Sequence, residues 1–136
     1  MKIGVASFMK SLNLMISKVK SLSPSDKVVI LTARGAWEPI KAYLNDQFSV
    51  DIKIVAVNSP DYSYLDGTGP DRKAAWVKNQ LSKGFHDIFF WDDSIDNIHA
   101  VKSIEKAHPE ASVTAHLVNN GKETAFKELK EIEKFQ

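Results

Sequence analysis

The sequence predicts an α/β fold: a three-layer αβα sandwich of Rossmann-like type with a mostly parallel sheet. Four short apolar runs rich in β-branched residues recur along the chain, which is typical of strands buried on both faces. Amphipathic segments separate these runs, and such alternation favours a parallel sheet with helices on both sides. The 136 residues suit one domain, and no repeat or linker divides residues 1–136.

The expected elements follow one another in a simple order. Strands are expected at residues 28–31, 52–57, 88–91 and 113–118, and residues 2–6 could form a further strand. Helical spacing of apolar residues predicts helices over residues 8–22, after Pro39, from Asp71 to Gly84, from Ser94 to His108, and through Phe126, Leu129 and Ile132. A long loop at residues 58–70 separates the second run from the third helix.

Composition and charge exclude several classes of protein. Lys and Arg number 18 against 17 Asp and Glu, so nucleic acid and anionic membranes are not indicated as partners. Without cysteine there are no disulfides, thiolate nucleophiles or Cys-based zinc sites. Lys10 interrupts the apolar stretch at residues 3–9, which argues against a signal peptide, and no run approaches the roughly 20 residues of a membrane span. We therefore expect a cytoplasmic protein.

Polar residues follow every expected strand. They are Thr32 to Gly35 after the first run, Asn58 and Ser59 after the second, Asp92 and Asp93 after the third, and Asn119 and Asn120 after the fourth. Ligands of open parallel sheets bind beyond the carboxyl ends of the strands. The sequence therefore predicts a binding site at this edge of the sheet.

The adjacent acids Asp92 and Asp93 have two interpretations. Two carboxylates at a buried strand end repel each other and lose hydration, and a hard cation such as Mg²⁺ would compensate through oxygen ligands. Alternatively, Ser94 and Asp96 simply cap the following helix, where acids are favoured by the helix dipole. The residues alone leave both interpretations open.

Phosphate could be bound by the segment after the first run. The Thr32 hydroxyl and the following backbone N–H groups could hold a phosphate oxygen, and Arg34 and Gly35 open a loop into a helix start. The alternative is a strand-ending Thr followed by a turn. Lys73 lies near the start of its expected helix, where the dipole opposes a cation unless an anion or carboxylate is close. Arg72 and Lys78 compete with Lys73 for that role.

Together these segments resemble the haloacid dehalogenase-like (HAD) superfamily, especially its small phage-type members. Residues 28–34 look like the second motif, Lys73 like the third, and residues 88–97 like the fourth. The resemblance implies Mg²⁺ as cofactor and a small phosphorylated molecule as substrate. It implies that Asp92 is a metal ligand, Asp93 a ligand or its partner, Thr32 a phosphate hydrogen-bonder and Lys73 the charge neutraliser.

The sequence departs from this family at its first motif. The family nucleophile follows the first strand in an Asp-x-Asp-x-Thr pattern, whereas the only acid before Thr32 is Asp26. The nucleophile strand could be missing from this reading frame, the chain could be a degenerate member, or residues 2–6 could rebuild the strand with Ser7 or Phe8 at the nucleophile position. A gap in the sheet would cost about 1–3 kcal/mol per unpaired buried group. Residues 2–6, or a second chain in a homo-oligomer, should therefore fill it.

These observations lead to one expectation and three alternatives. We expect a HAD-like domain with an incomplete phosphohydrolase site and no catalysis. The first alternative is a Mg²⁺-dependent phosphatase of nucleotides or nucleic-acid ends whose nucleophile is encoded upstream, and the second is a phosphate- or nucleotide-binding module. The third is a receiver-like doubly wound domain, which also uses a strand-end Thr and a Lys but places its paired acids near the first strand.

Overall fold

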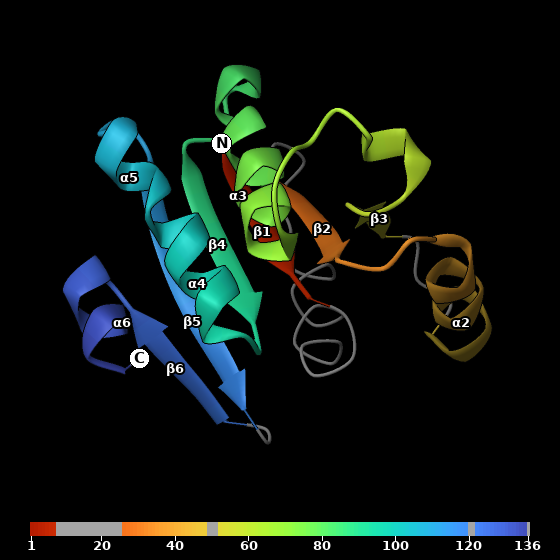
Figure 1. Ribbon diagram of the computed structural model, residues 1–136. Helices are drawn as coiled ribbons and strands as arrows, with labels where there is room; N and C mark the ends of the chain where they lie inside the picture. Colours follow the sequence, from red (N-terminus) through yellow and green to blue (C-terminus); the bar gives the residue numbers. More distant parts are fainter. Residues whose placement is uncertain (8–25, 49–51, 120–121, 136) are drawn as a thin grey trace.

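The computed structural model of the chain describes residues 1–7, 26–48, 52–119 and 122–135. Six strands form one sheet in the order β3-β2-β1-β4-β5-β6. They are β1 (Lys2–Ala6), β2 (Lys27–Thr32), β3 (Lys53–Ala56), β4 (Asp87–Asp92), β5 (Ser112–Asn119) and β6 (Lys122–Phe126). All neighbours pair in parallel except β6, whose arrow runs against that of β5 (Figure 1). The fold is thus α/β with a mostly parallel sheet of Rossmann-like order.

Helices connect these strands. They are α2 (Glu38–Phe48), α3 (Gly69–Asn79), α4 (Ile95–Lys102), α5 (Ile104–Ala107) and α6 (Leu129–Phe135), with short 3₁₀ turns at Pro60–Tyr62 and Leu81–Lys83. The helix expected over residues 8–22 lies outside the described residues.

Strand β1 occupies the centre of the sheet. Its residues pair with β2 on one side and with β4 on the other, and Ile3 and Val5 are fully buried. Residues 2–6 therefore fill the place between β2 and β4 that the sequence left in question. Of the two alternatives, residues 2–6 or a strand from a second chain, the first is the one that the structure shows at this place in the sheet.

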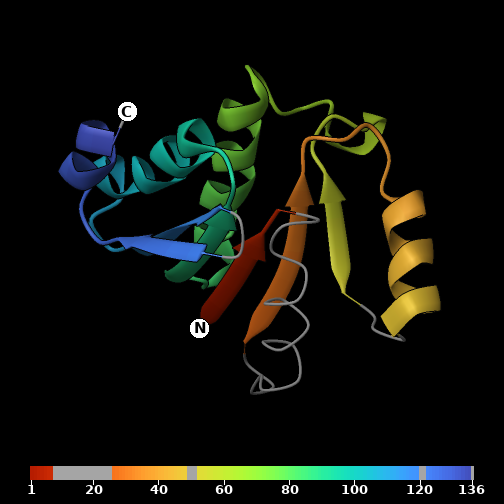
Figure 2. The same cartoon turned by 90° about the horizontal axis from the view of Figure 1, so that it is seen from below.

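Helices cover both faces of the sheet. Apolar side chains of β1 and β4, such as Val5 and Phe90, join the core cluster that also includes residues of α3, α4 and α6. Figure 2 shows these three helices together on one side of the sheet. Because side chains alternate along a strand, Ile30 of β2 points the other way and packs against Ile40 and Leu44 of α2.

The start of α3 differs from the prediction. The N-cap is Thr68, and Asp71, at which the helix was expected to start, lies within the first turn. Its carboxylate Oδ2 accepts hydrogen bonds from the Thr68 backbone N–H at 3.1 Å and from the Thr68 hydroxyl at 2.9 Å. Gly67, at φ +94°, turns the chain just before this cap, in a conformation that side chains disfavour. The helix therefore begins earlier than expected.

Two further predictions about elements were wrong. The helix expected from Ser94 to His108 is divided at Ser103, whose hydroxyl donates to the His99 carbonyl oxygen at 2.7 Å. Such side-chain bonds to the preceding turn often bend helices. Phe126 belongs to the edge strand β6 instead of the last helix, and it is the only residue of that strand that is buried. An edge strand with one buried residue leaves no alternating pattern in the sequence.

An ion pair between buried Lys102 and half-buried Glu105 covers the part of the β5 edge that β6 does not pair with. Lys102 of α4 is 3% exposed and its Nζ lies 2.6 Å from both the Val113 carbonyl oxygen and Glu105 Oε1. Glu105 Oε2 accepts from the Val113 N–H at 2.9 Å. The pair thus satisfies both backbone groups of Val113, which no β6 residue reaches.

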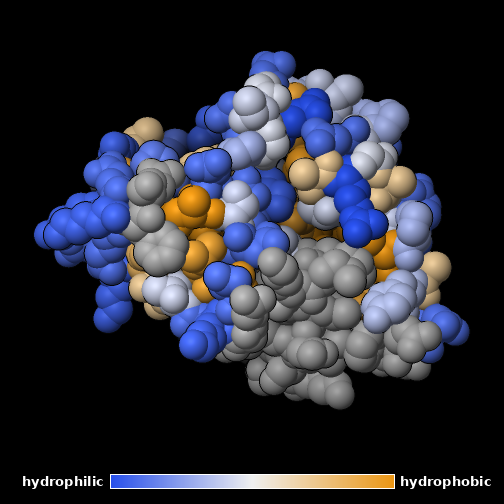
Figure 3. Space-filling view, turned by 60° about the horizontal axis from the view of Figure 1, so that its bottom comes forward, coloured by the Kyte–Doolittle hydropathy of each residue, from blue (hydrophilic) through white to orange (hydrophobic). Residues whose placement is uncertain are grey.

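Figure 3 shows one face of the molecule, on which hydrophilic side chains predominate among the described residues. On the face shown in Figure 3, apolar surface appears as separate areas among hydrophilic side chains. The large apolar residues that are exposed in the described part are Met1, Tyr43 and Tyr64. Among the described helices, none has the length and apolar character that crossing a bilayer would require.

Candidate functional site at the carboxyl edge of the sheet

The carboxyl ends of β1 and β4 form the topological switch point of the sheet. From β1 the chain continues to β2 on one side, and from β4 it continues to β5 on the other. The Ser7 N–H donates to the Trp91 carbonyl oxygen at 2.9 Å, so the parallel register extends one residue beyond Ala6. Ser7 and Asp92 consequently stand at the crevice where ligands of such sheets bind.

A buried ion pair lies at this switch point. Lys73 Nζ is 2.9 Å from Asp92 Oδ2, and the two side chains are 5% and 0% exposed. Lys73 extends from α3 to the end of β4. A cation near the start of a helix was expected to have an anion close by, and that anion is Asp92. Removing two charges from water is costly, and the close pairing offsets that cost.

Both carboxylate oxygens of Asp92 accept hydrogen bonds. Oδ1 accepts from the Ser94 N–H at 2.9 Å, and the Asn97 side-chain amide donates to both oxygens at 3.2 Å. Ser94 also caps α4 by accepting from the Asn97 N–H at 3.5 Å. The segment therefore caps a helix through Ser94, and the cation beside Asp92 is Lys73. The side-chain role of Asn97 was missed, although its place in the first turn after Asp92 could have indicated it.

The described side chains do not fit Mg²⁺ in this arrangement. No group of three or more His, Asp or Glu side chains in the described ranges is placed to hold a metal ion. Asp93 is exposed, whereas Asp92 is fully buried with donors on both oxygens. A cation could reach Asp92 only by displacing Lys73 or Asn97. The magnesium site stays a prediction, and no chemical step is derived through it.

Thr32 lies at the same edge of the sheet but in a different contact. It is 7% exposed at the end of β2, and its Oγ1 accepts from the Arg34 N–H at 3.3 Å. Arg34 and Gly35 are exposed in the following loop. Within the described residues no hydrogen bond joins Thr32 to the Lys73–Asp92 pair. The structure thus brings Lys73 and Asp92 together at the end of β4, and Thr32 lies on β2, with β1 between the two strands.

Arg72 and Lys78 do not share the role of Lys73. The Arg72 guanidinium donates twice to the Leu65 carbonyl oxygen, at 2.9 and 2.7 Å, and once to Asn58 Oδ1 at 2.8 Å. The Asn58 amide in turn donates to the Ala33 carbonyl oxygen. Lys78 is exposed farther along α3. Arg72 therefore ties the long loop to the loop after β2, and Lys73 is the cation that reaches the strand ends.

Ser7 presents a buried hydroxyl without a partner. The residue is 8% exposed, and its Oγ forms no hydrogen bond within the described part of the chain. Leaving such a group unpaired costs about 1–3 kcal/mol. Ser59 Oγ, after β3, is likewise buried and unpartnered, but β2 separates its strand from β1. Ser7 directly follows β1 beside the end of β4, so its unpaired hydroxyl is a buried donor at the switch point.

Comparison with known proteins gives no relative for this chain. No family model matches it, and neither does any curated protein or any solved structure. The interpretation of the site therefore depends on its geometry and on the order of its motifs.

Proposed function

We propose that this chain is a HAD-like domain that binds a phosphate group, free or on a small molecule, and does not hydrolyse it. The observation that carries the proposal is the buried, unpartnered hydroxyl of Ser7 at the β1–β4 switch point. A phosphate oxygen would accept its hydrogen bond and remove the cost of leaving it unpaired.

Charge neutralisation at the strand ends supports anion binding. Asp92 alone would repel a phosphate, but Lys73 lies 2.9 Å from it and cancels its charge. The exposed Arg34 in the loop after β2 adds a positive charge near the same edge of the sheet. Hydrogen bonds from hydroxyl and cationic donors to a phosphate are stronger than bonds between neutral groups.

The same contacts argue against hydrolysis. In the family that the chain resembles, the reaction begins at a carboxylate after the first strand, and here the residue after β1 is Ser7. A serine becomes a nucleophile when a base lies within hydrogen-bonding reach, and Ser7 Oγ has no such partner among the described residues. Asp92 is held in its ion pair and by three hydrogen-bond contacts from Ser94 and Asn97.

Thermal unfolding with inorganic phosphate tests the proposal. At ten times its Kd, phosphate should add about 1.4 kcal/mol of stability and raise Tm by about 3–5 °C. Ser7→Ala should abolish the shift, and the ligand-free variant should be at least as stable as the native chain, because the substitution removes a buried hydroxyl that has no hydrogen bond to lose. Ser59→Ala is the matched control, since it also removes a buried, unpartnered hydroxyl and should keep the phosphate shift.

Turnover of a generic phosphomonoester, with and without Mg²⁺, separates this proposal from a phosphatase. We expect stabilisation by phosphate without turnover. Magnesium-dependent turnover that Asp92→Asn abolishes would establish the phosphatase instead. The absence of any phosphate shift at millimolar concentration would overturn the binding proposal itself.

A further inference from the structure

Three lysines lie at the amino edge of the sheet, where the parallel strands begin, opposite the switch point. Lys27 begins β2, Lys53 begins β3, and Lys83 ends the 3₁₀ turn that leads from α3 toward β4. Lys53 and Lys83 are exposed, and Lys27 is half-buried. The contacts described above for Ser7 and Asp92 involve none of these three residues. This lysine cluster is therefore a separate feature of the molecule.

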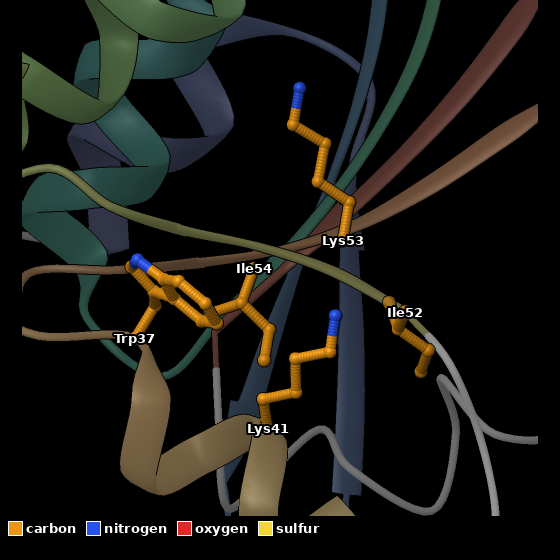
Figure 4. Close-up of a pocket in the computed structure, with 5 residues that line it drawn as sticks. All are labelled: Trp37, Lys41, Ile52, Lys53 and Ile54. Carbon is orange, nitrogen blue, oxygen red and sulfur yellow. The ribbon is translucent and has the colours of Figure 1, made fainter. Parts of the chain in front are cut away.

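The strand register directs two of these lysines to one face of the sheet. Side chains two residues apart along a strand share a face, so Lys27 projects on the same side as Val29, which belongs to the core under α3. Val29 is paired with Lys53 on β3, and paired residues of neighbouring strands also share a face. Figure 4 shows that Lys53 extends away from α2, whereas Ile52 and Ile54 border a cavity on the α2 side. Lys27 and Lys53 therefore both project on the side of the sheet that carries α3.

The turn after α3 adds the third lysine and an aromatic ring. Gly84, at φ +91°, ends the 3₁₀ turn directly after Lys83. Phe85 follows, and its side chain packs against the core on the α3 side. Lys27 Nζ lies 5.7 Å from the centre of the Phe85 ring, which is within the range of a cation–π contact. This contact brings the turn that contains Lys83 beside the start of β2.

The three ammonium groups repel one another. The pKa of Lys27 lies below its ordinary value of 10.5, first because burial removes water from the ammonium and then because Lys53 and Lys83 repel its charge. The ion pairs formed within the described residues include none of these three lysines. Like charges that are held close together cost free energy, and a bound anion would offset that cost.

The acids at the starts of β2 and β4 do not neutralise the lysine cluster. Asp26 directly precedes Lys27, but its Oδ1 accepts a hydrogen bond from the Lys2 N–H of β1 at 3.3 Å. Asp26 is also not among the charges that shift the pKa of Lys27. Asp87 begins β4 and alternates with Ile88, which belongs to the core under α3, so Asp87 projects to the opposite face.

We propose that Lys27, Lys53 and Lys83 together bind a small anion that carries several negative charges, such as linked phosphate groups or a tricarboxylate. Three positive charges at one edge attract a multivalent anion more strongly than an anion with a single charge. The formal charge of the whole chain is only +1, so a long polyanion would find no extended basic surface beyond the lysine cluster. Linked phosphates and clustered carboxylates present the same chemistry to ammonium groups, and the test therefore includes both. The proposal does not depend on phosphate binding at the switch point.

The test is an NMR titration of the whole ¹⁵N-labelled chain with tripolyphosphate and with citrate at low salt. We expect saturable shifts centred on the backbone amides of Lys27, Lys53 and Lys83. Acetate, which carries one charge, should bind about ten-fold more weakly or less tightly still. Raising the ionic strength from about 0.02 M to about 0.2 M should weaken binding several-fold, because salt screens exposed charges. Ser7→Ala should retain these shifts, which separates the lysine cluster from the switch point.

Lys27→Gln keeps most of the side-chain length and removes the charge. It should weaken binding of tripolyphosphate and citrate about ten-fold, equivalent to about 1.4 kcal/mol. Lys53→Gln, at an exposed position, should weaken binding in the same direction, so the test does not rest on the half-buried lysine alone. Lys134→Gln, at an exposed position on α6, is the matched control and should leave the affinity unchanged. The proposal is overturned if neither anion gives saturable shifts at millimolar concentration, if the shifts centre on other residues, or if Lys134→Gln weakens binding as much as Lys27→Gln and Lys53→Gln do.

Discussion

Replacing Lys73 by methionine tests the buried ion pair directly. Methionine has similar length and fits a buried position, so the change removes the charge and leaves most of the packing. Asp92 would then remain fully buried with its charge uncompensated, although the Ser94 N–H and the Asn97 amide would still donate to it. The loss should therefore fall at the lower end of the range for broken buried pairs.

The expected sizes follow from this geometry. Breaking a buried ion pair from one side costs about 3–5 kcal/mol, so Lys73→Met should lower the free energy of unfolding by about 3 kcal/mol. Asp92→Asn should cost about 2–3 kcal/mol, because the Lys73 ammonium loses its partner but can turn partly toward water. The double variant contains no unpaired buried charge. Its loss of unfolding free energy should therefore be about 2 kcal/mol smaller than the sum of the two single losses.

Urea unfolding of the native chain, both single variants and the double variant measures this coupling. Lys78→Met, at an exposed position on the same helix, is the control and should change stability by less than about 0.5 kcal/mol. Single losses below about 1 kcal/mol that simply add would refute the reasoning, since the two charges would then not be buried together.

The remaining predictions concern α3 and β5. Gly67→Ala should destabilise by about 1–2 kcal/mol in thermal unfolding, because Gly67 has φ +94° and an added Cβ would lie 2.7 Å from Asp71 side-chain atoms; an unchanged Tm would contradict this. Hydrogen bonds from the Thr68 backbone N–H, the larger cause, and from the Thr68 hydroxyl hold the pKa of Asp71 below its ordinary value of 3.8. The Asp71 carboxylate therefore contributes stability above pH 3.8, and this contribution is lost as the pH falls through the lowered pKa. Asp71→Asn should therefore be less stable than the native chain at neutral pH, with the difference shrinking below about pH 4 in a pH series of melting curves. Lys102→Met should cost about 2–3 kcal/mol in urea unfolding, because Glu105 loses its cation and the Val113 carbonyl oxygen its donor; a loss similar to that of Lys130→Met, at an exposed site on α6, would argue against this role.

The sheet was largely predictable from the sequence. The four apolar runs correspond to β2, β3, β4 and β5, because strands buried on both faces need continuous apolar residues and helices cannot be built from such short runs. Residues 2–6 form β1 for the same reason. Strand β6 was missed, since four of its five residues are exposed and its pairing with β5 leaves no trace in hydrophobic pattern.

The site was predictable in outline but not in its contacts. The described polar residues after the apolar runs lie at one edge of the sheet, because parallel strands end there together, and Asn120 lies outside the described residues. The packing of α3 across β4 determines which of the two acids is buried. It also places Lys73 where it cancels the charge of Asp92. Residues 19 apart in the sequence form that contact, and no local pattern encodes it. The position of the Ser7 hydroxyl at the strand ends could not be predicted either, because it depends on the pairing of β1 with β4.

The most direct test of the phosphate proposal is a titration of the ¹⁵N-labelled chain with inorganic phosphate, followed at the backbone amides. Binding at the β1–β4 switch point predicts saturable shifts centred on Ser7 and on residues 92–94, absent in Ser7→Ala and retained in Ser59→Ala. Shifts that centre elsewhere, or that persist unchanged in Ser7→Ala, would contradict it.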